Sequence, residues 1–422
     1  MRLIPPLLAA LLVLAAPAAA QRPIGPADVE PHLAALQAVA DANGGNRAAG
    51  RPGEPATVAY IASTLTSLGW GVTQQPVRFP YWEERTAPVV HDLVAGRDIV
   101  TLRGSGAADV TARVQRMPRS GCRRGDTRGF RRGRIALLPP GECFFRESVQ
   151  RFRRAGAAAV LLAIKPGPTG LLPGTLLRSV PVPALLVSRQ AARRLAGVRT
   201  PVRLAVDAFS ETRTATNVIA ERRGTAPREV VMAGGHLDSV PEGPGMNDNA
   251  SGVAALLAIA SRIDELSLRD TIRLGFWSAE EWGLWGSNHY VKKLPPRARR
   301  QIGVYLNADM VGSPNGSVDV YDAHPTVEGP LLRRLRGASQ VAFYGSSDHT
   351  AFVDAGIPTS GVFTGADERK TRAQARRWGG RAGEPRDPCY HRPCDTIANV
   401  DRKLLSRAAN ALAGAMVAFA RR

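Results

Sequence analysis

Histidine and carboxylate residues follow a series of short apolar runs in the second half of the chain. The first run, VVMAGGHLDS, has the pattern of a buried strand and ends in a turn that carries His236 and Asp238. Ligands of open α/β sheets bind beyond the carboxyl ends of the strands, and a neutral imidazole there suits a zinc ion. Asp238, two residues on, faces the same side of an extended chain, so it could fix the tautomer of the His236 ring.

Asp248 follows twelve residues after His236, in the loop GMNDNASG that opens a helix. A carboxylate in such a loop can bridge two cations, because it offsets the repulsion between ions about 3.5–4 Å apart. An aspartate at this place also suits a helix cap or a turn. The loop by itself leaves both roles open.

Two adjacent carboxylates, Glu280 and Glu281, end the next apolar run, in FWSAEEWGLWGS. Neighbouring side chains cannot readily do the same job, so one can bind a metal while the other accepts a proton from water. We predict Glu281 as the metal ligand and Glu280 as the general base. A solvated helix start would also favour Glu, but the flanking tryptophans argue against full exposure.

Two further segments complete a series of possible ligands. A third strand-like run delivers Asp309 in NADMVGSPN, and a late loop, DPCYHRPCDT, delivers His391. Each fragment alone is weak evidence for a metal ligand, because single histidines and aspartates are common. Together they give the order His, Asp, Glu-Glu, Asp, His at successive strand ends, which predicts a metal site of His236, Asp248, Glu281, Asp309 and His391.

The elements that must position these residues alternate between strands and helices. Helices are expected at 29–43, 56–68 and 253–266, and extended segments at 72–79, 215–221, 229–234, 271–278 and 304–310. This alternation predicts an α/β fold with an open, mainly parallel sheet flanked by helices. Residues 93–206 differ, since they carry short apolar strands punctuated by Gly, Pro and Arg, and we expect a small, β-rich domain inserted there.

The N-terminus, MRLIPPLLAALLVLAAPAAAQ, has a basic residue, an apolar run and small residues before a cleavage point. This pattern predicts a signal peptide over residues 1–20. A membrane anchor is the alternative, but the apolar run falls short of the roughly 20 residues that a spanning helix needs. The mature chain is therefore expected to be soluble, secreted and without a membrane span.

Four cysteines form two local pairs, Cys122 with Cys143 and Cys389 with Cys394. Four cysteines allow three connectivities, and export together with the local spacing favours these two disulfides. Zinc binding by Cys389 and Cys394 is the competing interpretation, although thiolate sites usually have more cysteines and shorter spacing.

The formal net charge of +20 is carried almost entirely by Arg, a pattern typical of biased codon usage. Arg is densest over residues 113–154, which lack the interleaved aromatic residues of single-strand binders. We therefore expect no nucleic-acid partner. Attachment of this basic stretch to anionic envelope polymers stays open as a binding function.

The motifs GGHLDS, GMNDNASG, FWSAEEWGLWGS, NADMVGSPN and CYHRPCDT resemble the secreted co-catalytic di-zinc, leucyl-type aminopeptidases of bacteria. The resemblance implies the phosphorylase/hydrolase-like core of the zinc exopeptidases and two Zn²⁺ ions per chain. By the family's pattern one zinc is bound at His236 and Asp309, the other at Glu281 and His391, with Asp248 as bridge, Glu280 as general base and Tyr390 as hydrogen-bond donor to the oxyanion.

The resemblance also covers the insert and the partners. Residues 93–206 resemble the protease-associated (PA) domain that interrupts such peptidases, with residues 21–92 and 207–422 as the peptidase domain. The family's substrates are peptide or protein N-termini, a hydrophobic first residue is its default, and a monomer is expected. Ser347, Asp348 and His349 recur near the family's site; contiguous residues cannot form a serine triad, so we expect them to support the ligands or line the pocket.

Two related activities stay open at this point. Carboxypeptidases share the scaffold and the insert, and would need cationic side chains for a terminal carboxylate. Glutaminyl-peptide cyclotransferases use a related fold with fewer metal contacts. The complete set of five ligands with both Glu280 and Glu281 favours hydrolysis, and GMNDNASG favours the aminopeptidase branch.

Overall fold

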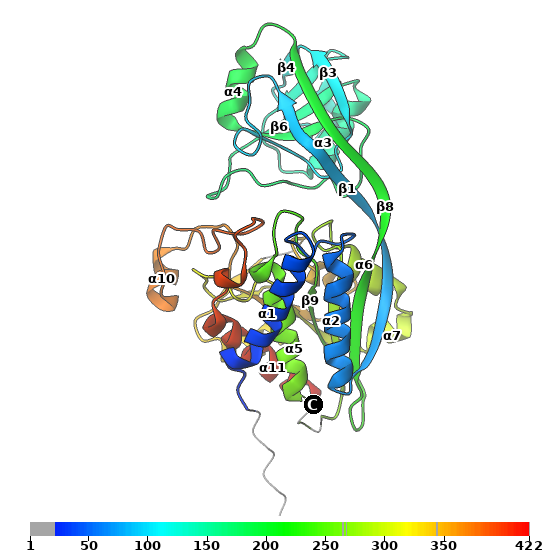
Figure 1. The fold of residues 1–422 in the computed structure, drawn as a ribbon, viewed down its shortest axis with the longest axis vertical. Coiled ribbons are helices and arrows are strands. Elements are labelled where there is room, and N and C mark those ends of the chain that lie inside the picture. Colours follow the sequence, from blue (N-terminus) through cyan, green and yellow to red (C-terminus); the bar gives the residue numbers. More distant parts are fainter. Residues whose placement is uncertain (1–21, 264–265, 267, 343–344, 422) are drawn as a thin grey trace, which may run out of the picture.

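The computed structural model describes residues 22–421, apart from 264–265, 267 and 343–344. The predicted signal peptide lies outside these described residues. The chain folds into a larger α/β body and a smaller β-rich body (Figure 1). Two long strands, β1 (Gly71–Val90) and β8 (Val202–Arg222), run antiparallel to each other from one body into the other. Within the described part of the chain, no helix is long and apolar enough to cross a membrane.

The sheet of the larger body has parallel strands at its centre and antiparallel ones toward its edges. Strand β9 pairs in parallel with β10 and β11, and β11 pairs in parallel with β14. The strand order is β1-β8-β10-β9-β11-β14-β12-β13, and β3 pairs with residues 202–206 of β8, in the smaller body (Figure 1). The bounds are β3 Ala108–Ala112, β9 Val230–His236, β10 Thr271–Trp277, β11 Ile302–Ala308, β12 Asp319–Tyr321, β13 Ser339–Val341 and β14 Thr359–Phe363.

Alternate residues of the central strands pack on opposite layers of helices. Val231 and Ala233 of β9 join a core with α1, α2, α5, α8 and α11, whereas Val230 and Met232 join a second core with α6 and α9. Both faces are thus apolar, as expected for parallel strands covered on two sides. The helices are α1 Pro26–Ala42, α2 Gly53–Ser67, α5 Ser251–Ile263, α6 Trp285–Lys293, α7 Pro296–Gln301, α8 Pro325–Arg334, α9 His349–Asp354, α10 Arg372–Trp378 and α11 Arg402–Ala420.

The predicted elements of the α/β body are present, with shifted ends. Helices α1, α2 and α5 correspond to the expected helices, and β9, β10 and β11 to the expected strands. The expected strands 72–79 and 215–221 are parts of β1 and β8, which extend much further toward the insert. The α/β class with flanking helices is confirmed, but the sheet is mixed and not mainly parallel. Three parallel pairs, β10 with β9, β9 with β11 and β11 with β14, occupy its centre, and β12 with β13 forms a further parallel pair at one edge.

The smaller body has a sheet of its own, in the order β2-β7-β6-β5-β4. A separate apolar core lies beneath it, and Cys122 and Cys143 form a disulfide there. Its elements are β2 Ile99–Thr101, β4 Val114–Arg116, β5 Ile135–Leu138, α3 Phe145–Arg154, β6 Ala159–Ile164, β7 Ala184–Ser188 and α4 Arg189–Gly197. The second predicted disulfide, Cys389 with Cys394, is also present. Both predicted pairings are confirmed.

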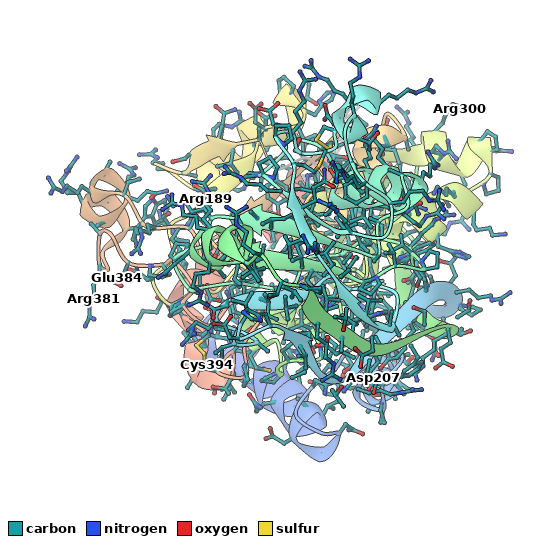
Figure 2. All side chains as sticks on the ribbon, turned by 90° about the horizontal axis from the view of Figure 1, so that it is seen from above. Arg189, Asp207, Arg300, Arg381, Glu384 and Cys394 are labelled. Carbon is teal, nitrogen blue, oxygen red and sulfur yellow. A yellow bond between two sulfur atoms is a disulfide. The ribbon has the colours of Figure 1, made fainter. Side chains whose placement is uncertain are left out.

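Positive charge is unevenly divided along the chain. Residues 93–206, the insert, carry 22 Lys and Arg against five Asp and Glu, out of 56 and 36 in the whole chain. Arginine side chains nevertheless project from separate parts of the surface, as Arg189, Arg300 and Arg381 show (Figure 2).

Candidate metal centre

Three neighbouring parallel strands bring the predicted residues to one edge of the sheet. His236 is the last residue of β9, Glu280 and Glu281 follow β10, and Asp309 follows β11. The register pairs Trp277 of β10 with His236, so the two strands end side by side. The carboxyl ends of parallel strands share an edge, which is why residues more than 70 positions apart meet here.

Asp248 lies between the two histidines of the site. Its Oδ1 is 3.1 Å from Nε2 of His236, and its Oδ2 is 3.1 Å from Nε2 of His391. Nε2 of His236 is also 3.3 Å from Oδ1 of Asp309, and Nε2 of His391 is 3.2 Å from Oε2 of Glu281. One carboxylate thus faces two imidazoles from its two oxygens.

These donors form two groups that share Asp248. In each group, ligand atoms of the three residues lie within 4.8 Å of one another: His236, Asp248 and Asp309 in the first, and Asp248, Glu281 and His391 in the second. A third group of the same kind joins Glu280 to His236 and Glu281. Imidazole nitrogen and carboxylate oxygen are the donors that zinc takes in catalytic sites.

The charge and hydrogen bonding of the cluster suit cations. Oε1 of Glu281 is buried and has no hydrogen-bond partner among the described residues. Burial opposes protonation of His391, but Glu281 and Asp248 together raise its pKa to about 10. The same negative potential attracts a divalent ion, since several buried carboxylates are stable together only when paired with positive charge. The residues present therefore fit zinc.

The ring of His236 is oriented by a backbone carbonyl. Nδ1 lies 3.0 Å from the carbonyl oxygen of Asp238, which can only accept, so Nδ1–H donates and Nε2 faces Asp248 and Asp309. The prediction that the carboxylate of Asp238 fixes this tautomer is wrong. That carboxylate is 3.8 Å away and accepts instead from the backbone N–H of Glu280, at 3.2 Å, because the turn after β9 points the carbonyl at the ring.

Ser347 supports Asp309, as expected of the segment GSSDHTAF. Its hydroxyl donates to Oδ2 of Asp309 at 2.7 Å and accepts from the side chain of Asn307 at 2.9 Å. Next to it, the ring of His349 lies against Tyr321, with ring centroids 4.5 Å apart. The prediction of a supporting role is confirmed for Ser347.

The loop carrying Asp248 is held by a residue that the sequence analysis missed. The carboxylate of Asp395 accepts from the backbone N–H groups of Asn247 and Asp248, at 2.9 and 3.0 Å. Asn249 caps α5 by accepting from the N–H of Gly252 at 2.9 Å, and the Asp248–Asn249 peptide is cis. The only sequence signal for Asp395 is its place directly after the Cys389–Cys394 loop.

Backbone conformations that L-residues rarely adopt occur at the site. Ala279, Met310 and His391 have φ angles of 57°, 49° and 57°. Two of them adjoin Glu280 and Asp309, and the third is itself a predicted ligand. Such conformations cluster at functional sites because the surrounding contacts must maintain them. None of these positions is a glycine, so the sequence gives no sign of them.

Tyr390 lies against His391 inside the disulfide loop, with ring centroids 3.8 Å apart. Burial, together with Asp248, Glu281 and Glu280, raises the pKa of its phenol well above the ordinary value. The phenol therefore keeps its proton at neutral pH and can act as a hydrogen-bond donor.

Removing the disulfide around His391 should lower activity even under conditions in which the variant remains folded. The double variant Cys389→Ser/Cys394→Ser should unfold with about 2 kcal/mol less free energy, from loop entropy alone. It should also lose at least about tenfold in kcat/KM well below its melting temperature, because Tyr390 and His391 are no longer held.

The matched control is Cys122→Ser/Cys143→Ser in the insert. Its longer loop predicts a larger stability loss, about 3 kcal/mol, with kcat/KM kept in the folded protein. Denaturant unfolding and steady-state kinetics measure both quantities. Equal activity losses in the two variants would contradict a positioning role for the Cys389–Cys394 loop.

Arg47 is a second residue that the sequence analysis missed. It is fully buried, and its guanidinium donates to the carbonyl oxygens of Pro244 at 3.0 Å, Gly245 at 2.7 Å and Leu237. It thereby ties the turn after β9 to the loop before Asp248. Burial lowers its pKa to about 10, so it stays charged near the carboxylates of the site. An Arg in the turn NRAAGRPG has no sequence signal for such a role.

The insert also reaches the site, through Arg103. This buried side chain forms an ion pair with Glu242 at 2.7 Å and donates to the backbone carbonyl of Glu281 at 3.3 Å. A second contact joins the insert to the loop after His391, where Arg392 donates to the carbonyl of Thr169. The smaller body thus contacts the metal centre's surroundings at two places.

The fold and this donor set define a metal-dependent hydrolase of the α/β class. The family model "Peptidase family M28" matches residues 217–416, and the model "PA domain" matches residues 107–195, inside the predicted insert. An aminopeptidase of Pseudomonas aeruginosa is 35% identical, over 95% of this chain and 82% of its own length. Leucine aminopeptidase 2 of Trichophyton rubrum is 32% identical, over 93% of this chain and 84% of its own length.

A solved aminopeptidase from Aneurinibacillus sp. strain AM-1 superposes with a TM-score of 0.77 at 28% identity, covering 93% of this chain and 94% of the other. A zinc aminopeptidase from Bacillus subtilis shares the fold, with a TM-score of 0.74 at 24% identity, covering 93% of this chain and 95% of the other. The chain belongs to peptidase family M28 and contains an inserted PA domain. It is a zinc-dependent aminopeptidase.

Proposed function

We propose that the protein is an exported aminopeptidase that works with two zinc ions. His236, Asp248 and Asp309 would hold one ion, and Asp248, Glu281 and His391 the other. The observation that carries this proposal is the position of Asp248, with one oxygen 3.1 Å from each histidine. A shared carboxylate of this kind keeps two cations close while reducing their repulsion.

When bound, the zinc pair supplies a Lewis acid that polarises the scissile carbonyl and lowers the pKa of a water molecule. Glu280 accepts the proton of the attacking water and then passes it to the leaving amine. Burial, together with Asp348 and Glu281, raises the pKa of Glu280 well above that of a free carboxyl, which suits a group that must both take and return a proton.

Tyr390 donates a hydrogen bond to the oxyanion of the tetrahedral intermediate. Its protonated phenol, packed against His391, can provide this donor without rearrangement. The free amino group of the substrate lies against the carboxylates of the site, which would restrict cleavage to the first residue.

Export and substrate preference are supported by separate observations. The signal-like N-terminus and the two disulfides favour an oxidising, extracytoplasmic location. A hydrophobic first residue is supported by the relative named leucine aminopeptidase 2. The complete ligand set with Glu280 and Glu281 favours hydrolysis over cyclisation of glutaminyl peptides.

A panel of p-nitroanilides tests the proposal. Leucine, methionine and phenylalanine p-nitroanilides should be cleaved fastest, and acetyl-leucine p-nitroanilide should not be cleaved. Dipeptides with an amidated carboxyl end should remain substrates, because only the amino end is recognised. Cleavage that requires a free carboxyl end, and tolerates a blocked amine, would instead indicate a carboxypeptidase.

A further inference from the structure

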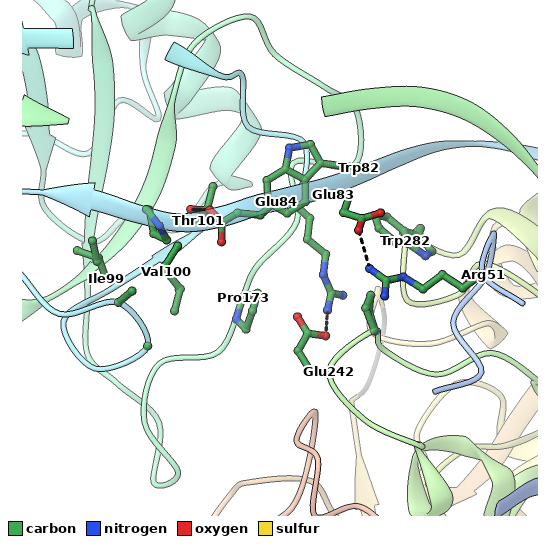
Figure 3. A pocket seen from close by; sticks show the side chains of 16 residues that line it. Arg51, Trp82, Glu83, Glu84, Ile99, Val100, Thr101, Pro173, Glu242 and Trp282 are labelled. Atoms are coloured by element: carbon green, nitrogen blue, oxygen red, sulfur yellow. Dashed lines mark hydrogen bonds and ion pairs between the residues drawn. The ribbon is translucent and has the colours of Figure 1, made fainter. Parts of the chain in front are cut away.

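A pocket lies between the insert and the peptidase body, beside the metal centre. Its volume is about 370 Å³. Figure 3 shows Glu84 and Thr101 on the side of the insert, and Glu242 and Trp282 on the side of the peptidase body. Val100, Pro173 and Pro241, which are partly exposed, add apolar surface to its lining.

The lining of the pocket is linked to the predicted ligand Glu281 through two residues. Trp282, the next residue in the chain, lines the pocket, and so does Arg103, which donates to the carbonyl of Glu281. A peptide whose first residue lies at the metal centre therefore has a second binding surface within reach.

The three carboxylates of the pocket differ in their partners. Glu83 pairs with Arg51 at 3.3 Å, and Glu242 pairs with Arg103 at 2.7 Å (Figure 3). Glu84 accepts a hydrogen bond from the hydroxyl of Thr101, and no Lys or Arg nitrogen of the described residues lies within 4 Å of it. Burial raises the pKa of Glu84, and Glu242 adds to the rise, as expected of a carboxylate that lacks a cation.

We propose that this pocket binds the side chain of a peptide residue downstream of the cleaved bond and prefers Lys or Arg there. The inference rests on the proposed aminopeptidase function and adds a specificity site to it. The apolar stem of the Lys or Arg side chain packs on Val100 and Pro173, and its charged end pairs with Glu84. A partly buried carboxylate that lacks a cation is stabilised in its charged form when a positive group pairs with it.

Peptides of the form Leu-Ala-Ala-Ala-amide test this, with Lys, norleucine or Glu placed at the second, third or fourth residue. At one of these positions kcat/KM should be about fivefold or more higher for Lys than for norleucine, the scale of one partly exposed ion pair. Glu should be the poorest of the three residues there.

Glu84→Gln should abolish the preference for Lys, so that kcat/KM becomes about equal for Lys and norleucine at that position. Hydrolysis of leucine p-nitroanilide should be unchanged, since its p-nitroaniline leaving group carries no positive charge to pair with Glu84. Glu83→Gln is the matched control, because Glu83 lies on the same wall but already pairs with Arg51, and it should keep the preference.

The outcomes separate the two proposals. Absence of leucine p-nitroanilide hydrolysis by the wild-type holoenzyme would overturn the proposed function. Normal hydrolysis of that substrate with equal rates for Lys and norleucine at all three positions would overturn the pocket assignment alone. A Lys preference that survives Glu84→Gln would also overturn it.

Discussion

Replacing Glu280 with Gln should lower kcat for leucine p-nitroanilide about 10³-fold while zinc remains bound. The amide has the size of the carboxylate but cannot accept the proton of the attacking water, and general-base catalysis contributes about 10²–10⁴-fold. Kinetics at saturating substrate measure the loss. The KM should change little, because Glu280 acts on the water more than on the ground-state peptide.

The neighbouring variant Glu281→Gln provides the control. Glu281 faces Nε2 of His391 at 3.2 Å, so its loss should appear first as a lower zinc content and only then as lower activity. The two variants would thus lose activity for different reasons, Glu280→Gln through loss of the base and Glu281→Gln through loss of zinc. Near-wild-type hydrolysis by Glu280→Gln would mean that the base is another residue.

Replacing Asp248 with Asn should remove at least one zinc ion per chain and lower kcat/KM at least about 10³-fold. The amide keeps one oxygen but loses the negative charge that offsets repulsion between two cations. Elemental analysis after dialysis, with circular dichroism to show that the fold persists, measures the effect.

Asp395→Asn is the matched comparison for this variant. Asp395 supports the same loop, because its Oδ1 accepts from the N–H of Asn247 and its Oδ2 from the N–H of Asp248, and an asparagine keeps only one of these two acceptors. It is not among the predicted ligands, so Asp395→Asn should lower the zinc content less than Asp248→Asn does. If Asp248→Asn instead kept all of its zinc and its activity, Asp248 could not be the bridge.

The strands at the centre of the fold could be predicted because their apolar composition follows from burial on both faces of the sheet. Strands β9, β10 and β11 are covered on both faces, so each is a short apolar run that stands out in the sequence. Only parts of strands β1 and β8 are predicted from the sequence. Where they cross between the bodies, at residues 83–87 of β1 and 209–214 of β8, successive side chains are exposed or half-buried, which interrupts the alternation, although residues 202–208 of β8 alternate regularly.

That the candidate ligand residues lie together could be predicted for a related reason. His236, Glu281 and Asp309 end or follow buried strands, and the order of residue types along the chain carries the family's pattern. Arg47 and Arg103 could not be predicted, because they bind backbone carbonyls of loops that lie more than 130 positions away. A carbonyl acceptor exists at every residue, so nothing in the sequence marks which one is used.

The central claim, that five residues hold two zinc ions, is tested most directly by zinc stoichiometry in the mature protein. Chelated, inactive protein should be titrated with zinc while bound metal and leucine p-nitroanilide hydrolysis are followed together. Binding should saturate at two zinc ions per chain, and full activity should appear only when both are bound. Saturation at one ion with full activity would contradict this claim.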